Sequence, residues 1–377
     1  MWSLLMTSGI FLAFCVWFLY PLALYHGSNG LVHVPILSLL RFSLKVRIQS
    51  WILWGFSRVF RNVPRLPAVD RLPNHVLRVL GNNPSQMTLD GTNVYIVGNG
   101  SSRVLIDSSD GNASFIKTLL QVCQCHGVRE ISDLLITHGH LDHVGGLLQL
   151  QKHYPAMKVW KYLPVNGRKG DGDGDRRLCL SNDESRQLGI QALVDGQKFQ
   201  VPGSGVLTTI YTPGHCNDHV CFLLDSVEGQ KASVLFSGDC VLGFGSCMFD
   251  SLPDLMSSLA KLNACGASAI YPGHGPMVSD APTKILEYIA HRQQREDEVL
   301  AVLKKYSDHV EGLSSSDIVD RVYEPLPYVL RLSARKTVEK HLQKLLVEVR
   351  VRQIRRSGWF QTATYCLSED IPRKLAS

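Results

Sequence analysis

The chain has 377 residues, of which 45% are hydrophobic and 19% are charged. This length suits about two domains with buried cores, and the composition excludes a disordered or fibrous protein. The formal net charge of +6 lies entirely within residues 1–69, which contain six basic residues and no acidic one. A neutral body therefore follows a basic, apolar leader.

The leader has two apolar segments. Residues 4–25 carry no charge, and their length fits one transmembrane helix. Residues 36–62 mix Arg and Lys with Leu, Ile and Trp, which is typical of an amphipathic helix in a membrane interface. Since the positive charge follows the first segment, we expect a single-pass membrane protein with its catalytic body facing the cytosol. A cleaved signal peptide, a buried core helix and a mitochondrial presequence remain alternatives.

From about residue 70, short apolar runs alternate with turn residues and amphipathic stretches, which favours sheets flanked by helices. The apolar runs predict strands at 76–80, 93–97, 104–106, 134–137, 205–212, 220–224, 233–237 and 269–271. The amphipathic stretches predict helices at 115–125 and 255–262. A polar insert at 165–187 predicts a solvated loop.

The C-terminal part has a helical pattern. A long amphipathic helix is predicted at 285–306, a second near 317–323 with Ser314–Ser316 as its cap, and a third at 332–348. Two alternating runs, 349–354 and 360–366, predict a hairpin. Three helices followed by a hairpin indicate a winged-helix domain. We therefore divide the chain into a leader (1–69), a body (70–280) and a winged-helix domain (281–377).

The residues most indicative of chemistry follow the strand at 134–137. Three imidazoles and one carboxylate occur within six residues, at His138, His140, Asp142 and His143. In an extended chain His138 and His140 point the same way, and Asp142 and His143 can face a second point after a turn. Nitrogen and oxygen donors of this kind suit Zn²⁺ and, less exclusively, Mn²⁺ or Fe²⁺. The cluster predicts a metal site.

Three more donors, His215, Asp239 and His274, each follow a predicted strand downstream. With these residues the sequence resembles the metallo-β-lactamase superfamily, in its glyoxalase II branch. The resemblance implies a four-layer αββα sandwich and two Zn²⁺ ions per chain. One ion would be held by His138, His140 and His215 and the other by Asp142, His143 and His274, with Asp239 bridging. Asp107 would brace the site, although its surroundings depart from the usual Asp-Thr-Gly.

Other segments resemble the beta-lactamase-like protein 2 family over about residues 70–366. They are 78–84, 87–93, 212–219, 237–243 and the motif His291-Arg-x-x-Arg. Members of that family are described as endoribonucleases on single-stranded RNA, and closely similar chains as thioesterases acting on acyl carrier proteins. The implied chemistry is attack by a hydroxide held between two zinc ions on phosphorus or on a carbonyl carbon, with Asp142 and Asp239 as catalytic residues.

Two further residues close to His215 are candidates for supporting the site. Imidazole ligands need a hydrogen-bond partner on their second ring nitrogen, and Asp218 and His219 could supply one. Purely structural hydrogen bonding by these two residues is an equal alternative.

The third helix and the hairpin of the winged-helix domain are strongly basic. The candidate contacts to a nucleic-acid backbone are Arg335, Lys336, Lys340, Lys344, Arg350 and Arg352. A solvated helix face, or a docking surface for an acidic carrier protein or anionic lipid, would have the same composition.

The first hypothesis is a membrane-anchored, zinc-dependent endoribonuclease. The second is an acyl-thioester hydrolase, and the third is an inactive adaptor that binds nucleic acid or a membrane. We expect single-stranded RNA or an acyl thioester as substrate and no nucleotide cofactor.

Overall fold

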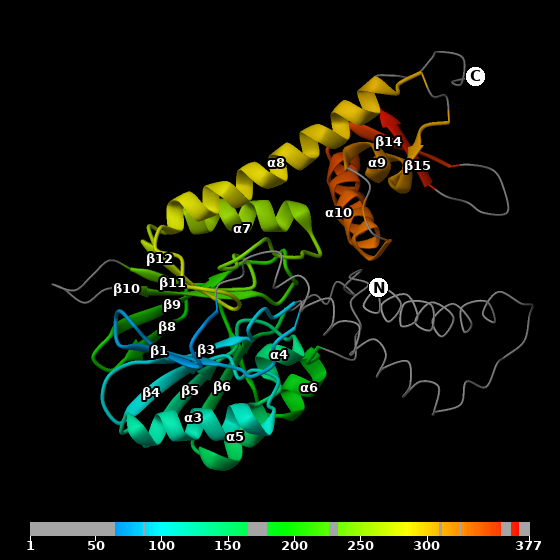
Figure 1. Cartoon of the computed structure of the whole chain (residues 1–377). Helices are drawn as coiled ribbons and strands as arrows, with labels where there is room; N and C mark the ends of the chain where they lie inside the picture. Colours follow the sequence, from blue (N-terminus) through cyan, green and yellow to red (C-terminus); the bar gives the residue numbers. More distant parts are fainter. Residues whose placement is uncertain are drawn as a thin grey trace, which may run out of the picture. The chain divides into compact units, whose positions relative to one another are not determined.

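The computed structural model describes residues 65–85, 87–164, 179–225, 233–308, 311–323, 326, 328–355 and 363–368 (Figure 1). The chain divides into two compact units, Met1–Leu53 and Trp54–Ser377. All described residues belong to the second unit.

The N-terminal half of this unit forms a seven-stranded sheet whose order follows the chain. Its strands are β1 (Val69–Leu72), β2 (Val76–Leu80), β3 (Asn93–Val97), β4 (Ser102–Ile106), β5 (Glu130–Leu135), β6 (Lys158–Tyr162) and β7 (Gln191–Leu193). The first four are antiparallel and β4 to β7 are parallel. The parallel connections carry helices α3 (Ala113–Cys125), α4 (Leu141–Val144), α5 (Leu147–His153) and α6 (Asn182–Gln187).

The second sheet has five strands in the order β12-β11-β10-β9-β8. They are β8 (Lys198–Val201), β9 (Gly205–Tyr211), β10 (Val220–Asp225), β11 (Val234–Gly238) and β12 (Ala269–Pro272). Only the β11–β12 pair in this sheet is parallel. Helices α7 (Leu252–Ala264) and α8 (Ala281–Lys305) follow β11 and β12.

Alternating side chains join the layers into a sandwich. On β3, Ile96 packs into a core with Phe115 and Leu119 of α3, whereas Tyr95 packs between the two sheets. This follows from the two-residue period of a strand, which sends neighbouring side chains to opposite faces. The outer face of the second sheet packs on α7 and α8. Figure 1 shows the resulting layers of helices, sheet, sheet and helices, as predicted.

The C-terminal part has the predicted winged-helix pattern. Helices α9 (Ser315–Val322) and α10 (Tyr328–Val347) pack with the end of α8 around a small core. A three-stranded sheet of β13 (Leu313–Ser314), β15 (Ala363–Leu367) and β14 (Val351–Arg355) completes the domain. Ser314 caps α9 through a capping box with Asp317, as the sequence predicted for this helix start.

The prediction of a solvated loop at 165–187 is wrong for part of this segment. Residues 182–187 form α6, because Ser181 and Glu184 make a capping box that satisfies the first backbone N–H groups of that helix. Residues 165–178 of the same insert lie outside the described residues. The sequence analysis also did not predict the short strands β1, β6, β7 and β8.

The predicted membrane localisation is also corrected. Among the residues that the structure describes, no helix combines the length and the apolar character needed to cross a bilayer. The segments 4–25 and 36–62, on which the anchor and the cytosol-facing orientation were based, lie outside the described residues.

A buried ion-pair cluster joins α8 to α10 and to the start of the wing. Glu296 of α8 is 3% exposed, and its carboxylate oxygens lie 2.7 Å from Lys344 Nζ and 3.1 Å from Arg350 Nη1. Burial alone would raise the pKa of Glu296, but His341 and Lys344 lower it to about 2. The ionised carboxylate therefore stabilises the fold.

We expect Glu296→Gln to lower the free energy of unfolding at pH 7 by about 2–4 kcal/mol. The pKa in the folded state lies below its ordinary value of 4.5, so the stabilisation is present above pH 4.5 and is lost as the pH falls toward 2. Urea unfolding at pH 7, 5 and 3 should show the difference shrinking. Glu298→Gln, in a more exposed pair with Arg295, is the control and should cost less than about 1 kcal/mol. A loss independent of pH would contradict this assignment.

Candidate metal centre

The first donor group consists of His138, His140, His215 and Asp239. His138 and His140 follow the carboxyl end of β5, His215 follows β9, and Asp239 follows β11. Nδ1 of His140 lies 2.8 Å from His138 Nε2 and 3.1 Å from His215 Nε2. Nε2 of His215 lies 3.6 Å from Asp239 Oδ2. The strand ends of both sheets thus bring four donors together.

The second donor group consists of Asp142 and His143 of α4 and His274, which follows β12. Nε2 of His274 lies 3.3 Å from Asp142 Oδ2 and 3.3 Å from Asp239 Oδ1. Nε2 of His143 lies 3.4 Å and 3.5 Å from the same two oxygens. Oδ2 of Asp239 therefore faces the first group and Oδ1 faces the second, so this carboxylate lies where it could bridge two metal ions.

These donors fit metal ions. A tetrahedral Zn²⁺ ion with bonds of about 2.0–2.1 Å has its ligand atoms about 3.3–3.4 Å apart, close to the spacing in the second group. In addition, His143 Nε2 and Asp239 Oδ1 are buried and have no hydrogen-bond partner among the described residues. Buried polar atoms without partners are costly, and a cation would satisfy both.

Hydrogen bonds on the second ring nitrogen orient the imidazoles. His143 Nδ1 donates to Asp107 Oδ2 at 2.7 Å, and His215 Nδ1 donates to the carbonyl of Met248 at 2.8 Å. With these two hydrogen bonds, Nε2 of His143 and Nε2 of His215 are each directed at the other donors of their group. Asp107 also accepts from the backbone N–H of Thr137 at 2.8 Å, and its φ of 62° is unusual for a residue other than glycine. The structure thus places Asp107 where the sequence predicted a brace.

The predicted supporting residues act on different parts of the site. His219 Nε2 accepts from the backbone N–H of Asp239 at 3.1 Å, so its Nδ1 donates to Thr212 Oγ1 at 2.9 Å. His219 therefore fixes the backbone that carries the bridging carboxylate. Asp218 accepts from the N–H of Gly139 at 3.0 Å and so holds the turn between His138 and His140.

Charge is balanced differently in the two groups. Burial lowers the pKa of His138 well below its usual range and that of His215 to about 4. Burial alone would also lower the pKa of His274, but Asp239 and Asp142 raise it to about 9. Neutral His138 and His215 are ready to bind a cation, whereas His274 must release a proton to do so.

Family models match most of this region. The metallo-β-lactamase superfamily model matches residues 87–274, and the model of the β-lactamase-associated winged-helix domain matches 314–359. The chain is 36% identical over 282 residues to the "Beta-lactamase-like protein 2 homolog" of Caenorhabditis elegans, covering 74% of this chain and 86% of that protein. The chain belongs to the metallo-β-lactamase superfamily. The predicted fold is therefore confirmed, and the chain has the hydrolase fold of this superfamily.

Two further relatives have names that differ from this one and from each other. "Lactamase-like protein adaB" of Aspergillus niger is 39% identical over 246 residues, 65% of this chain and 68% of that protein. "Atrochrysone carboxyl ACP thioesterase" of Aspergillus fumigatus is 36% identical over 278 residues, 71% of this chain and 79% of that protein. A crystal structure of a β-lactamase domain protein from Burkholderia ambifaria aligns with a TM-score of 0.62 at 18% identity, covering 80% of this chain and 95% of that one. That likeness supports the fold alone.

Sequence reasoning missed two polar residues at this metallo-β-lactamase site. Thr92 Oγ1 donates to Asp142 Oδ2 at 3.1 Å. Lys161 of β6 is 1% exposed, and its Nζ lies 2.6 Å from Asp218 Oδ2. Both residues are distant in sequence from the carboxylates that they reach, so no local pattern could have identified them.

Two glycines allow close packing at the bridge. A Cβ at Gly273 would lie 2.5 Å from Asp239 Oδ1, and one at Gly238 would lie 2.6 Å from His219 Nε2. Gly238 also has a φ of +48°. Any side chain at either position would displace the groups that hold or form the bridge.

The basic residues predicted to contact nucleic acid separate into two sets. In the first set, Arg335 pairs with Glu339, Lys344 and Arg350 pair with Glu296, and Arg352 donates to the Ser368 carbonyl. The other two, Lys336 and Lys340, lie one turn apart on α10. Burial raises the pKa of Asp250, and these two lysines oppose that rise. The N–H of Asp250 bonds the carbonyl of His215 at 3.2 Å, so the charge of these two lysines acts on a residue that contacts a predicted metal ligand.

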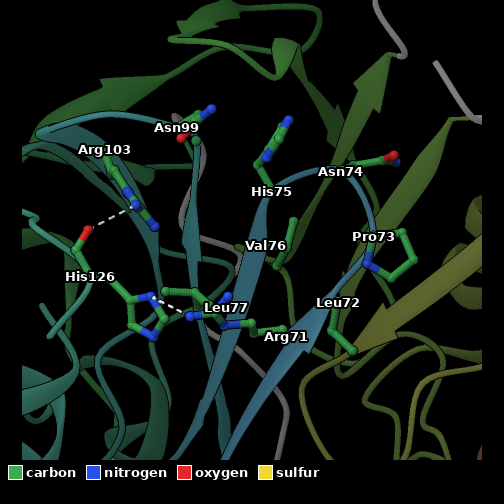
Figure 2. Close-up of a pocket in the computed structure, with 11 residues that line it drawn as sticks. Arg71, Leu72, Pro73, Asn74, His75, Val76, Leu77, Asn99, Arg103 and His126 are labelled. Atoms are coloured by element: carbon green, nitrogen blue, oxygen red, sulfur yellow. Dashed lines mark hydrogen bonds between the residues drawn. The ribbon is translucent and has the colours of Figure 1, made fainter.

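A separate cavity lies at the opposite end of the first sheet (Figure 2). Its lining includes Arg71, His75, Arg103 and His126 and no metal-site residue. Arg103 Nη2 donates to the His126 carbonyl at 3.2 Å, and Arg71 Nη2 lies 3.3 Å from His126 Nδ1. Arg103 is near the start of β4, whereas the metal centre follows the end of that strand, so the two sites are distinct.

We expect Lys161→Met to destabilise the protein by about 3–5 kcal/mol, because it leaves the buried carboxylate of Asp218 unpaired. Adding Asp218→Asn should recover much of this loss, since the amide oxygen can still accept from Gly139. Urea unfolding of the metal-free protein measures both effects. Lys158→Met, an exposed lysine on the same strand, is the matched control and should change stability by less than about 0.5 kcal/mol. Equal losses from Lys161→Met and Lys158→Met would contradict the role of the ion pair.

Proposed function

We propose that this protein is a metal-dependent hydrolase that cleaves phosphodiester bonds in single-stranded RNA. The observation that carries the proposal is the pair of donor groups sharing Asp239, with Lys336 and Lys340 on the neighbouring helix. Two cations, for which Zn²⁺ is the best match to the donors, would be held by His138, His140 and His215 and by Asp142, His143 and His274.

The bound cations would supply Lewis-acid chemistry, lowering the pKa of water and stabilising negative charge on the substrate oxygen. Asp142 is the more exposed of the two carboxylates, at 28% against 12% for Asp239, and its Oδ2 faces His143 and His274, so Oδ1 would be the oxygen that accepts a proton from the attacking water. Lys336 and Lys340 would bind backbone phosphates and position the chain without selecting its sequence. This division assigns proton transfer to the body and substrate binding to α10.

A second candidate, hydrolysis of acyl thioesters, has its own support. One relative is named as an acyl-carrier-protein thioesterase. In addition, two large apolar side chains are exposed beside the ligands: Leu141, between His140 and Asp142, is 45% exposed, and Met248, whose carbonyl orients His215, is 51% exposed. An acyl group would find apolar contacts there, and the phosphate of a carrier arm could pair with Lys336 and Lys340.

A paired assay tests these candidates. The purified chain, loaded with Zn²⁺, is incubated separately with labelled single-stranded RNA and with an acyl thioester. Asp142→Ala/His143→Ala should reduce turnover of the true substrate at least about 100-fold. Asp183→Ala, an exposed change on α6, should leave it unchanged.

The outcomes separate the hypotheses. RNA cleavage that persists in the double variant would reveal a contaminant and contradict the first proposal. Thioester turnover alone, lost in the double variant, would establish the second. No turnover together with well under one Zn²⁺ per chain would favour an adaptor that binds without catalysis.

Lys336→Gln/Lys340→Gln should raise KM for RNA about tenfold and leave kcat nearly unchanged, because the lysines bind the substrate away from the reacting bond. The slope of log affinity against log salt should fall by about 1 to 2. Arg335→Gln is the matched control, since this neighbour pairs with Glu339 at 2.8 Å. The same KM increase in the control would contradict a specific role for the two lysines.

A further inference from the structure

A buried arginine on α8 supports the loop that orients a metal ligand. Arg292 is 5% exposed, and no carboxylate oxygen of the described residues lies within 4.0 Å of its guanidinium. Instead, its Nη2 donates to Ser246 Oγ at 2.5 Å and to the carbonyl of Cys247 at 2.9 Å. Its guanidinium carbon also lies 4.7 Å from the centre of the Phe249 ring. A charge buried without a counter-charge is costly, so these contacts indicate a specific task.

The loop at 242–250 depends on α8 for its conformation. It contains neither helix nor strand, so its backbone groups need partners elsewhere. The hydroxyl of Tyr288 accepts from the N–H of Leu242 at 3.0 Å and donates to the carbonyl of Gly245 at 3.0 Å. Tyr288 therefore holds the first part of the loop, and Arg292 holds the second part.

The next residue after Cys247 carries the contact to the metal centre. The carbonyl of Met248 accepts from Nδ1 of His215 at 2.8 Å. A displacement of this carbonyl would turn the imidazole or leave its Nδ1 proton unbonded, and Nε2 would then point away from His140 and Asp239.

We propose that Arg292 is a positioning residue for the metal ligand His215, acting through the loop at 242–250. The inference rests on the metal site of the proposed function. It accounts for the motif His291-Arg-x-x-Arg, whose two arginines have different partners. Arg292 holds the loop, whereas Arg295, one turn later, stacks on Tyr323 at the end of α9 at 4.2 Å and pairs with Glu298.

The same loop also meets the winged-helix domain. The ring of Phe249 lies edge-on to the ring of His341 on α10, with 6.5 Å between their centres. Arg292 covers Phe249 from the side of α8. The winged-helix domain thus contributes to the shape of the metal site as well as to the substrate surface.

Titration with Co²⁺ tests this inference without any substrate. The full chain is stripped of metal with a chelator and titrated with Co²⁺, whose visible absorption reports ligand geometry, while a competing chelator gives the affinity. Arg292→Met fills the space between Phe249 and Tyr288 but donates no hydrogen bond. We expect it to weaken Co²⁺ binding at one of the two sites about 10- to 100-fold and to change the absorption spectrum. Arg292→Lys should restore part of the affinity.

Arg295→Met is the matched control, because it removes an arginine from the same helix that does not contact the loop. The Co²⁺ affinity of this variant should stay within about twofold of that of the unaltered chain. Tyr288→Phe keeps the aromatic ring and loses only the loop contacts, so a loss of several-fold is expected even if Arg292→Met fails to fold. Unchanged Co²⁺ affinity in Arg292→Met, or in Tyr288→Phe where Arg292→Met does not fold, would overturn the inference. No Co²⁺ binding by the unaltered chain would overturn the metal-dependent function as well.

Discussion

The carboxylate of Asp239 lies between two groups of side chains that could hold metal ions, and contacts from several elements of the fold keep it there. Its two oxygens lie 3.3 Å from His274 and 3.6 Å from His215. A carboxylate can satisfy both groups only if its backbone is fixed to within a few tenths of an ångström. His219 bonds that backbone directly, and Gly273 leaves room for the carboxylate because it has no side chain. A bridging position for Asp239 would explain why a glycine without a side chain and a histidine that bonds the backbone lie beside this carboxylate.

The same requirement explains the packing of the two sheets. His138, His140, Asp142 and His143 come from the first sheet and its connections, whereas the other three donors come from the second. The relative position of the sheets therefore sets the spacing of the donors. An aromatic cluster of Tyr95, Phe236 and Tyr271 fixes that position between the sheets, with ring centres 5.2 to 5.8 Å apart. Tyr95 and Asn93 of β3 also bond the carbonyl of Pro272, two residues before His274.

What could be predicted from the sequence depended on distance along the chain. The donors were identified because four of them lie within six residues and the others follow recognisable strands. The cap of α9 was predicted because a run of serines, Ser314–Ser316, lies directly at the predicted start of the helix. The roles of Lys161 and Thr92 were not predicted because each acts on a residue brought near only by the fold. Arg292 was part of a recognised motif, but its contacts with the loop at 242–250 could not be predicted for the same reason. For the same reason, charge composition did not reveal that Lys344 and Arg350 pair with Glu296, about 50 residues earlier.

These ion pairs change the interpretation of the winged-helix domain. A basic helix and wing suggest an independent nucleic-acid module docked onto an enzyme. In the structure much of that charge is used to attach α10 and the wing to α8, and α8 in turn carries Tyr288 and Arg292 to the loop beside His215. Of the six candidate contacts, Lys336 and Lys340 oppose the rise that burial causes in the pKa of Asp250, whose N–H bonds the carbonyl of His215. The donor groups and the basic helix therefore share one set of contacts, because α8, whose side chains hold the loop that orients His215, also pairs with the helix that carries these two lysines.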